Sequence, residues 1–351
     1  MILNILKVFA PSVIAFVIGI GLTPFLTDYL YRNQMWKKRA GKVAPDGGAT
    51  PIFNKLHKEK EVGTPRMGGI IIWASVLVTT LLMWLFGVID SSPLAQKLDF
   101  LSRNQTWLPL FTLIAASLVG LVDDVLQVKG TGTYISGGLS FWKRVVIVSL
   151  IGLVGGWWFY ARLGVSSIAI PFDGVLVLGP LIIPFFIIVM LALFSSGVID
   201  GIDGLAGGVM AAIFASYAGI AFMQNQIDLA AFCAVILGGI LAFLWFNIPP
   251  ARFYMSETGM LGLTTTLTVI AFLTGQVLVL PIIAFPLVAT SLSDIIQLTS
   301  KKFRGKKVFL VAPLHHHFEA LGWPSYKVVM RYWVLSVVVA IIGMIIAVIG
   351  S

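Results

Sequence analysis

The sequence YWVLSVVVAIIGMIIAVI, residues 332–349, contains no charged side chain. A helix of roughly 20 apolar residues crosses the ~30 Å hydrocarbon core of a bilayer. Comparable runs occupy Val8–Phe25, Ile70–Val88 and Val145–Tyr160. Because lipid offers no water to an exposed backbone amide, these runs are predicted to be membrane-spanning helices.

The composition agrees with this interpretation. Of 351 residues, 58% are hydrophobic and 11% are charged, whereas a soluble domain has about 25% charged residues. The sequence predicts an all-α integral membrane protein with about ten transmembrane helices, built as a single domain over residues 1–351. The expected spans lie near 8–30, 68–89, 107–122, 144–160, 178–198, 207–223, 229–247, 259–275, 277–299 and 332–350. In the ninth span, Pro286 predicts a break and a lateral groove for a lipid tail.

Positive charge predicts the orientation of these helices. The net charge is +9, and most lysines and arginines lie in four loops, 31–66, 123–144, 248–258 and 300–331. Ten spans place these loops on one side, which the positive-inside rule makes cytoplasmic. Both termini are then expected outside. The basic surplus is therefore a topology signal, and no nucleic-acid partner is expected.

Acidic residues gather at helix ends on the same side. Asp123 and Asp124 close one apolar run, Asp200 and Asp203 follow another, and Glu257 precedes the eighth span. Carboxylates at a membrane boundary are costly unless they are paired, hydrated or bound to a metal. Mg²⁺ takes one or two protein carboxylates and completes its shell with water and phosphates. Each group alone could simply end a helix in water, but three of them together favour a metal-assisted phosphate site.

Three further features on this side have two interpretations each. Gly204 begins a glycine-rich run that fits either a helix N-terminus for an anion or a hinge between packed helices. The turn Gly63–Gly69, with Arg66, fits either phosphate binding or entry into a helix. The consecutive histidines at 315–317 cannot all converge on one tetrahedral zinc ion. Phosphate binding or ordering of the site is expected of them instead.

The last of these motifs resembles a known family. Pro313–Glu319, PLHHHFE, followed by Gly322-Trp323, resembles the signature that separates the phospho-N-acetylmuramoyl-pentapeptide transferases from transferases of other sugar phosphates. Gly63–Gly69, GTPRMGG, is similar to the GTPxMGG turn of that family. Asp200–Ala206, DGIDGLA, resembles its second acidic motif.

Two further matches follow the family order. Asp123-Asp124 with Lys129 resembles the first acidic motif, and Trp245–Asn247 followed by Pro250-Ala251 resembles the segment before the third. The resemblance implies ten transmembrane helices around a cytoplasmic active-site cleft in the bacterial inner membrane. It also implies transfer of phospho-MurNAc-pentapeptide from UDP-MurNAc-pentapeptide to undecaprenyl phosphate. The products would be lipid I and UMP, with Mg²⁺ as cofactor, in peptidoglycan synthesis for the cell wall. A homodimer is left open.

The resemblance also implies roles for individual residues. Asp123 and Asp124 would bind or deprotonate the lipid phosphate, Asp200 would complete the catalytic acids, and Glu257 would hold the metal. His315, His316 and His317 would contact or order the phosphosugar. The expected substrate-binding residues are Lys60, Thr64, Lys129, Asp203, Gly204, Asn247 and Tyr254. Whether the lipid phosphate attacks directly or through an aspartyl intermediate is left open.

The chain departs from the family pattern inside the site. Glu257 stands where the family motif MGDTGS has aspartate, and Gly197 stands where the family has asparagine. In the ninth span, Thr290 replaces a glutamate and Asp294 lies nearby. These departures are also compatible with a weakened or inactive homologue. The sequence further leaves open another UDP-HexNAc:polyprenyl-phosphate transferase, a membrane transporter and a non-catalytic scaffold.

Overall fold

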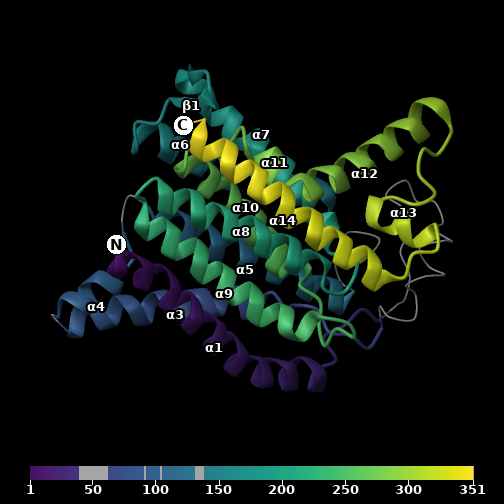
Figure 1. Cartoon of the computed structure of the whole chain (residues 1–351). Helices are drawn as coiled ribbons and strands as arrows, with labels where there is room; N and C mark the ends of the chain where they lie inside the picture. Colours follow the sequence, from purple (N-terminus) through teal and green to yellow (C-terminus); the bar gives the residue numbers. More distant parts are fainter. Residues whose placement is uncertain (39–61, 91, 103–104, 131–137, 351) are drawn as a thin grey trace.

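The computed structural model describes residues 1–38, 62–90, 92–102, 105–130 and 138–350, which form a bundle of helices (Figure 1). Its long helices are α1 (Ile2–Arg32), α3 (Ile70–Ile89), α5 (Trp107–Lys129), α6 (Phe141–Ala161), α7 (Ile182–Ser195), α8 (Leu205–Met223), α9 (Ile227–Asn247), α10 (Ser256–Leu273), α12 (Phe285–Arg304) and α14 (Ser325–Ile349). The shorter elements are α4 (Pro93–Leu98), α11 (Leu280–Ile283), α13 (Leu314–Ala320), the 3₁₀ helices η1 (Gly179–Leu181) and η2 (Ser196–Ile199), and the strands β1 (Ser167–Ile170) and β2 (Gly174–Val177). The two strands form an antiparallel hairpin.

The predicted membrane spans are confirmed at nine places. In the described ranges, nine helices are long and apolar enough to cross a membrane. They are α1, α3, α5, α6, the continuous segment Gly179–Ile199 that contains α7, α8, α9, α10 and α14. Each coincides with one of the predicted spans, so the chain is a mostly helical integral membrane protein.

The predicted span 277–299 has a different form. Helix α11 ends before Ala284, and α12 begins at Phe285 with Pro286 in its first turn. Proline is tolerated there because the first amides of a helix have no intrahelical acceptor. Helix α12 projects away from the bundle (Figure 1), and its last turn carries Lys301, Lys302 and Arg304. A short helix and a projecting amphipathic helix therefore replace one straight span.

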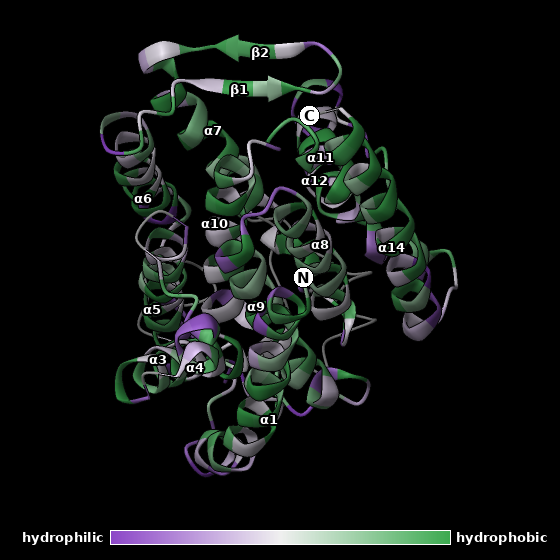
Figure 2. Ribbon diagram, turned by 60° about the vertical axis from the view of Figure 1, so that its left-hand side comes forward, coloured by the Kyte–Doolittle hydropathy of each residue, from purple (hydrophilic) through white to green (hydrophobic). Residues whose placement is uncertain are grey.

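The outer faces of the bundle are apolar. Figure 2 shows hydrophobic residues along the helices and hydrophilic ones mainly in the connections. Helix α14, for example, exposes Val334, Val337, Ile341 and Ile345. Apolar side chains exposed along the full length of a helix are suited to contact with lipid.

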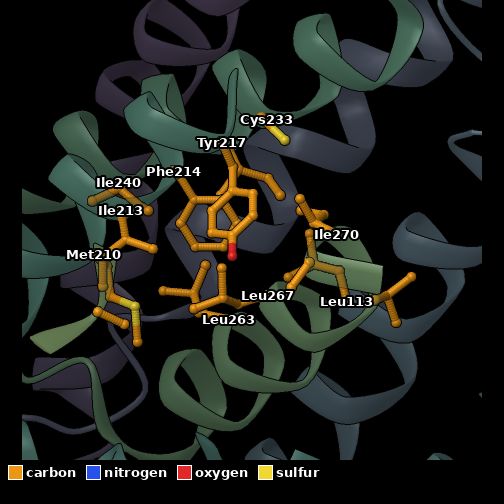
Figure 3. Close-up of a cluster of buried hydrophobic side chains, with 14 of the residues drawn as sticks. Leu113, Met210, Ile213, Phe214, Tyr217, Cys233, Ile240, Leu263, Leu267 and Ile270 are labelled. Atoms are coloured by element: carbon orange, nitrogen blue, oxygen red, sulfur yellow. The ribbon is translucent and has the colours of Figure 1, made fainter. Parts of the chain in front are cut away.

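Helix α10 lies at the centre of the bundle, and 89% of its span is buried. Around it, Tyr217 of α8, Cys233 of α9 and Leu113 of α5 are completely or almost completely buried, as Figure 3 shows. The Tyr217 hydroxyl donates to the backbone carbonyl of Gln276 over 3.1 Å. Because α10 is packed on all sides, its first residues are held in a fixed position at one end of the bundle.

The two ends of the bundle differ. Both ends of the chain lie away from α13 (Figure 1), and the amide of Phe172, in the β-hairpin turn, donates to Gly350 near the C-terminus. At the opposite end, Arg66 in the turn before α3 meets α5, and Arg144 near the start of α6 meets α10. This arrangement agrees with the predicted grouping of the basic loops on one side.

Candidate active site

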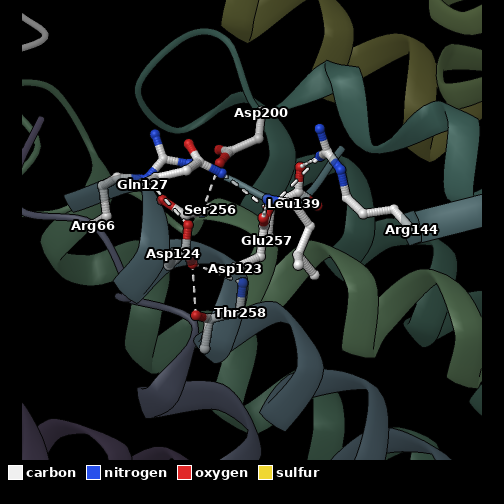
Figure 4. Close-up of polar contacts among 10 residues, drawn as sticks. All are labelled: Arg66, Asp123, Asp124, Gln127, Leu139, Arg144, Asp200, Ser256, Glu257 and Thr258. Atoms are coloured by element: carbon white, nitrogen blue, oxygen red, sulfur yellow. Dashed lines mark hydrogen bonds and ion pairs between the residues drawn. The ribbon is translucent and has the colours of Figure 1, made fainter. Parts of the chain in front are cut away.

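Four acidic side chains from separate parts of the chain meet at the basic end of the bundle (Figure 4). Asp123 and Asp124 lie on the last turns of α5, Asp200 follows η2, and Glu257 lies in the first turn of α10. We call these four residues the acidic cluster. The predicted convergence of three acidic groups on one face is thus present in the structure.

Glycines bring the helices that carry these acids into close contact. A Cβ on Gly120 of α5 would lie 2.2 Å from the carbonyl oxygen of Glu257. A Cβ on Gly262 would lie 2.1 Å from the Ser117 hydroxyl, and one on Gly69 would lie 2.3 Å from the Gly259 amide. Small residues at such crossings let helix backbones approach closely in membranes. They place the start of α10 directly against the end of α5.

Asp124 joins three segments and is completely buried. Its Oδ2 accepts hydrogen bonds from the backbone amide of Thr258 (2.9 Å) and from the Thr258 hydroxyl (2.6 Å). Its Oδ1 accepts from Nε of Arg66 at 3.1 Å. The amide belongs to the first turn of α10, where the helix dipole favours a negative charge. Both oxygens are therefore occupied, and the carboxylate fixes α5 to α10 and to the turn before α3.

Asp123 is also held by donors, most of them neutral. Its Oδ2 accepts from the Gln127 side-chain amide at 2.9 Å, and its Oδ1 accepts from the Leu139 backbone amide at 2.5 Å. Arg144 lies farther away, with Nη1 at 3.8 Å from Oδ2. A Cβ on Gly138 would lie 2.6 Å from Asp123 Oδ1. The absence of a side chain there lets the backbone reach the carboxylate.

Glu257 is the most exposed acid of the two helices. Its side chain is 25% exposed, compared with 2% for Asp123 and 0% for Asp124. Its Oε1 accepts from Arg144 Nη1 at 2.6 Å. Of these three carboxylates, Glu257 is therefore the one that water or a hydrated ion reaches most easily.

The backbone at the start of α10 is held in a strained form. Ser256 has φ 58° and Met67, in the facing turn, has φ 71°. A non-glycine residue in this region costs roughly 1–3 kcal/mol and persists only where its surroundings enforce it. The Ser256 amide donates to Asp200 Oδ2 at 2.8 Å, and the Gly68 amide donates to the Tyr254 carbonyl at 2.8 Å. These bonds hold both strained residues beside the acidic cluster.

The charges of the cluster suit one divalent cation. Four carboxylates and the guanidinium groups of Arg66 and Arg144 sum to a formal charge of −2. In the described part of the chain, no group of three His, Cys, Asp or Glu side chains is placed to hold a metal ion by itself. Mg²⁺ commonly binds through one or two carboxylates plus water and phosphate oxygens. The oxygen donors present are therefore of the kind that Mg²⁺ prefers.

A second group of predicted residues surrounds Gly204. Its amide donates to Asn247 Oδ1 at 2.9 Å, and its carbonyl accepts from the Trp333 indole at 3.1 Å. Asp203 Oδ2 accepts from the Ala251 amide at 3.3 Å. The φ of Gly204 is +81°, a conformation that favours glycine. The structure thus brings Asp203, Gly204 and Asn247 together, and Asn247 is buried with its amide used to shape this loop.

The histidines pack against the segment between Asp200 and Asp203. A Cβ on Gly201 would lie 2.5 Å from His315 Nε2 and 2.8 Å from His316 Nε2. Both histidines are buried. The sequence predicts that the two motifs serve one site, and in the structure they are in direct contact.

Other contacts fix the orientation of α13. His316 Nδ1 and Glu319 Oε2 are 2.7 Å apart, and Ser325 donates to the other Glu319 oxygen at 2.6 Å. His317 is half-buried, and its Nδ1 accepts from the Leu310 amide at 3.2 Å. Each of these bonds uses a side chain of the PLHHHFE segment, so the segment has a defined conformation.

The remaining predicted residues lie in different places. Thr64 is half-buried in the turn before α3, and the amide of Tyr254 donates to the Pro65 carbonyl at 2.9 Å. Lys129 is exposed at the last residue of α5, and in the described ranges no contact joins it to the acidic cluster. Lys60 lies outside the described residues.

Two residues that contact the acidic cluster, Arg144 and Gln127, are not among the predicted site residues. Arg144 contributes in the sequence only to the positive-inside charge, because a lone arginine in a basic loop carries no other signal. Gln127 does carry a signal, since it lies four residues after Asp123 and hence on the same helix face. The sequence marks Arg66 as a phosphate contact but does not predict its ion pair with Asp124.

Comparison with known proteins gives the family. Residues 106–275 match the model of glycosyl transferase family 4. The chain is 33% identical over 341 residues to a phospho-N-acetylmuramoyl-pentapeptide-transferase of Bacillus cytotoxicus, covering 95% of this chain and 96% of that protein. It is 35% identical over 343 residues to the protein of the same name from Geobacillus sp. (strain WCH70), covering 94% of this chain and 95% of the relative. Taken with the acidic cluster and the histidine helix, these matches show that the chain belongs to the phospho-N-acetylmuramoyl-pentapeptide-transferase family.

Proposed function

We propose that this chain transfers phospho-MurNAc-pentapeptide from UDP-MurNAc-pentapeptide to undecaprenyl phosphate, giving lipid I and UMP. The observation that carries the proposal is the convergence of four carboxylates and two arginines at one end of a membrane bundle, beside the buried histidines of α13. The membership of the family over nearly the whole chain supports it. Positioning and neutralisation of charge are the main requirements of phosphoryl transfer.

Mg²⁺ is the proposed cofactor, held by Glu257 and Asp200. When bound, it supplies positive charge to the donor diphosphate and to the departing UMP. The exposure of Glu257 and the net charge of the cluster support this assignment. The ion pair between Arg144 and Glu257 fixes the glutamate side chain, which is one methylene longer than the aspartate of the family. It therefore supports an active site in which Glu257 takes the place of that aspartate.

The two adjacent aspartates have different proposed roles. Asp124 accepts from a guanidinium, a hydroxyl and an amide, so both of its oxygens are occupied. It therefore orients the cluster. Asp123 accepts from neutral amides, with Arg144 at 3.8 Å. Asp123 is accordingly the proposed acceptor of the proton from the lipid phosphate.

Helix α12 offers a place for the lipid chain. An open depression of about 360 Å³ lies along it, lined by Ile295, Ile296, Thr299, Ser300, Phe303, Arg304 and Val308. The lining is mostly apolar, which suits a polyprenyl chain. The same helix holds the segment before the histidines, because Gln297 accepts from the amides of Val308 and Phe309 at 3.0 Å each.

The orientation follows from charge. The basic loops that surround the acidic cluster are proposed to face the cytoplasm of a bacterial cell, where UDP-linked donors are made, with both termini outside. The protein then lies in the inner membrane with its active site cytoplasmic.

The proposal is tested by measuring UMP release from purified protein in detergent. The complete mixture of UDP-MurNAc-pentapeptide, undecaprenyl phosphate and Mg²⁺ is expected to release UMP. Omission of the lipid, addition of EDTA, or Asp200→Asn should abolish release. UDP-GlcNAc in place of the donor tests the neighbouring transferase activity. Release with UDP-GlcNAc alone would replace the proposed donor, and movement of substrate across vesicles without conversion would replace the proposed enzyme by a transporter.

A further inference from the structure

Arg66 has a partner at only part of its guanidinium group. It lies in the turn before α3, at the position that the family's GTPxMGG pattern leaves variable. Its Nε donates to Asp124 Oδ1 at 3.1 Å. Among the residues that the structure describes, this is its only side-chain partner, so the terminal Nη groups are available. The side chain is 17% exposed, so part of it can be reached by a ligand.

The surroundings of Arg66 are strongly acidic. Burial alone would lower the pKa of Arg66, but the attraction of Asp124, with contributions from Glu257 and Asp200, raises it above the usual value. Arg66 is therefore a fixed positive charge within range of three acids of the cluster. In Figure 4 the acids lie between Arg66 and Arg144, so the two cations flank the place where a phosphate would enter.

Neutralisation of Asp124 does not by itself require an arginine. Asp124 already accepts two hydrogen bonds from Thr258, and a lysine at position 66 would supply the same charge. An arginine offers more, because its planar group presents several N–H donors in a fixed fork that matches phosphate oxygens. One edge can stay on a carboxylate while the other binds an anion.

We propose that Arg66 is a substrate-binding residue whose Nε remains on Asp124 while its Nη groups hold a phosphate oxyanion beside Asp124 and Asp200. The inference rests on the proposed phosphosugar transfer and adds to it a residue that the family pattern does not specify. The phosphate belongs either to the nucleotide donor or to the lipid acceptor. Both present the same oxyanion chemistry, and separate binding measurements distinguish them.

The test measures binding without turnover. UDP and undecaprenyl phosphate are titrated separately, by calorimetry in detergent with EDTA, into the wild-type chain and into Arg66→Lys. A lysine keeps the charge beside Asp124 but cannot bind both groups through one fork. The loss of charge-assisted hydrogen bonds predicts about 10- to 100-fold weaker binding of at least one ligand. The matched control is Arg32→Lys, which alters an exposed arginine paired with Asp28 at 2.8 Å and should bind both ligands like wild type.

Each outcome decides one point. A loss confined to UDP assigns the phosphate to the donor, and a loss confined to undecaprenyl phosphate assigns it to the acceptor. Affinities of Arg66→Lys within twofold of wild type for both ligands would overturn the inference and leave the proposed function intact. Wild-type protein that binds neither ligand when the titrations are repeated with Mg²⁺ in place of EDTA would contradict the proposed function itself.

A second pair of variants distinguishes phosphate binding by Arg66 from a role limited to neutralising Asp124. Asp124→Asn releases Arg66 from its carboxylate, whereas Asp124→Asn with Arg66→Met leaves no buried charge unpaired. If Arg66 only neutralises Asp124, the double variant should bind UDP and undecaprenyl phosphate as well as Asp124→Asn does. The inference instead predicts about tenfold weaker binding or more by the double variant, at equal thermal stability.

Discussion

The hydroxyl of Thr258 provides a sharp test of how the acidic cluster is held. Thr258→Val keeps the shape of the side chain and the backbone hydrogen bond to Asp124 but removes the hydroxyl bond of 2.6 Å. A hydrogen bond to a charged group contributes about 1.5–3 kcal/mol. Neutral bonds between membrane helices average about 0.6 kcal/mol. Because the acceptor here is a completely buried carboxylate, we expect a loss of about 2 kcal/mol.

Thr266 provides a matched control on the same helix. It is completely buried, and in the described part of the chain its hydroxyl has no hydrogen-bond partner. Thr266→Val removes an unpaired polar group, so its expected effect lies between zero and a gain of about 1 kcal/mol. Thr258→Ser retains the hydroxyl and should retain most of the stability.

The assay is unfolding by SDS in mixed micelles, followed by circular dichroism, with the free energy of unfolding compared among the three variants and wild type. Phosphosugar transfer is measured in parallel, and Thr258→Val is expected to be slower because Asp124 loses a constraint. The reasoning is refuted if Thr258→Val loses no more stability than Thr266→Val.

Two further predictions concern other parts of the molecule. Gly197→Asn introduces the residue of the family pattern where an added Cβ would meet only Met260, at 3.8 Å. Its unfolding free energy should stay within about 0.5 kcal/mol of wild type, and its UMP release should not fall. A clear loss of either would contradict the conclusion that position 197 has room for a side chain. Lys7 is nearly buried and forms an ion pair with Asp228, which is 26% exposed. Lys7→Met should lower the free energy of SDS unfolding by about 2–3 kcal/mol, somewhat less than the loss expected on breaking a fully buried pair. Lys7→Met combined with Asp228→Asn should recover most of that loss.

Much of the fold was predictable because lipid imposes a simple rule on sequence. Long apolar runs such as the one in α14 must be helices, and their ends are marked by charge. The segment 277–299 escaped this rule. Its apolar composition predicts one span, but Ala284 separates α11 from α12, and the helix that follows Pro286 is amphipathic. Pro286 does predict the break, but hydropathy averaged over a window does not show that the helix after it is amphipathic and projects from the bundle (Figure 1).

The sequence predicts those residues of the site that are rare at a membrane boundary, and it does not predict those that are common in basic loops. Buried acids such as Asp124 at a membrane boundary are costly, so their presence in the sequence is informative. Arg144 and Leu139 fall in the basic loop predicted for residues 123–144, and only the fold brings them to Glu257 and Asp123. Gly120 likewise matters only because α10 passes within contact distance.

The most direct test of phosphosugar transfer is to follow both products of the unmodified chain in one reaction. Mass spectrometry of the lipid fraction is combined with quantification of UMP after incubation with UDP-MurNAc-pentapeptide, undecaprenyl phosphate and Mg²⁺. We predict lipid I and UMP in equal amounts, with neither formed in EDTA. UMP without lipid I, or no product from protein that still binds UDP, would contradict transfer by this acidic cluster.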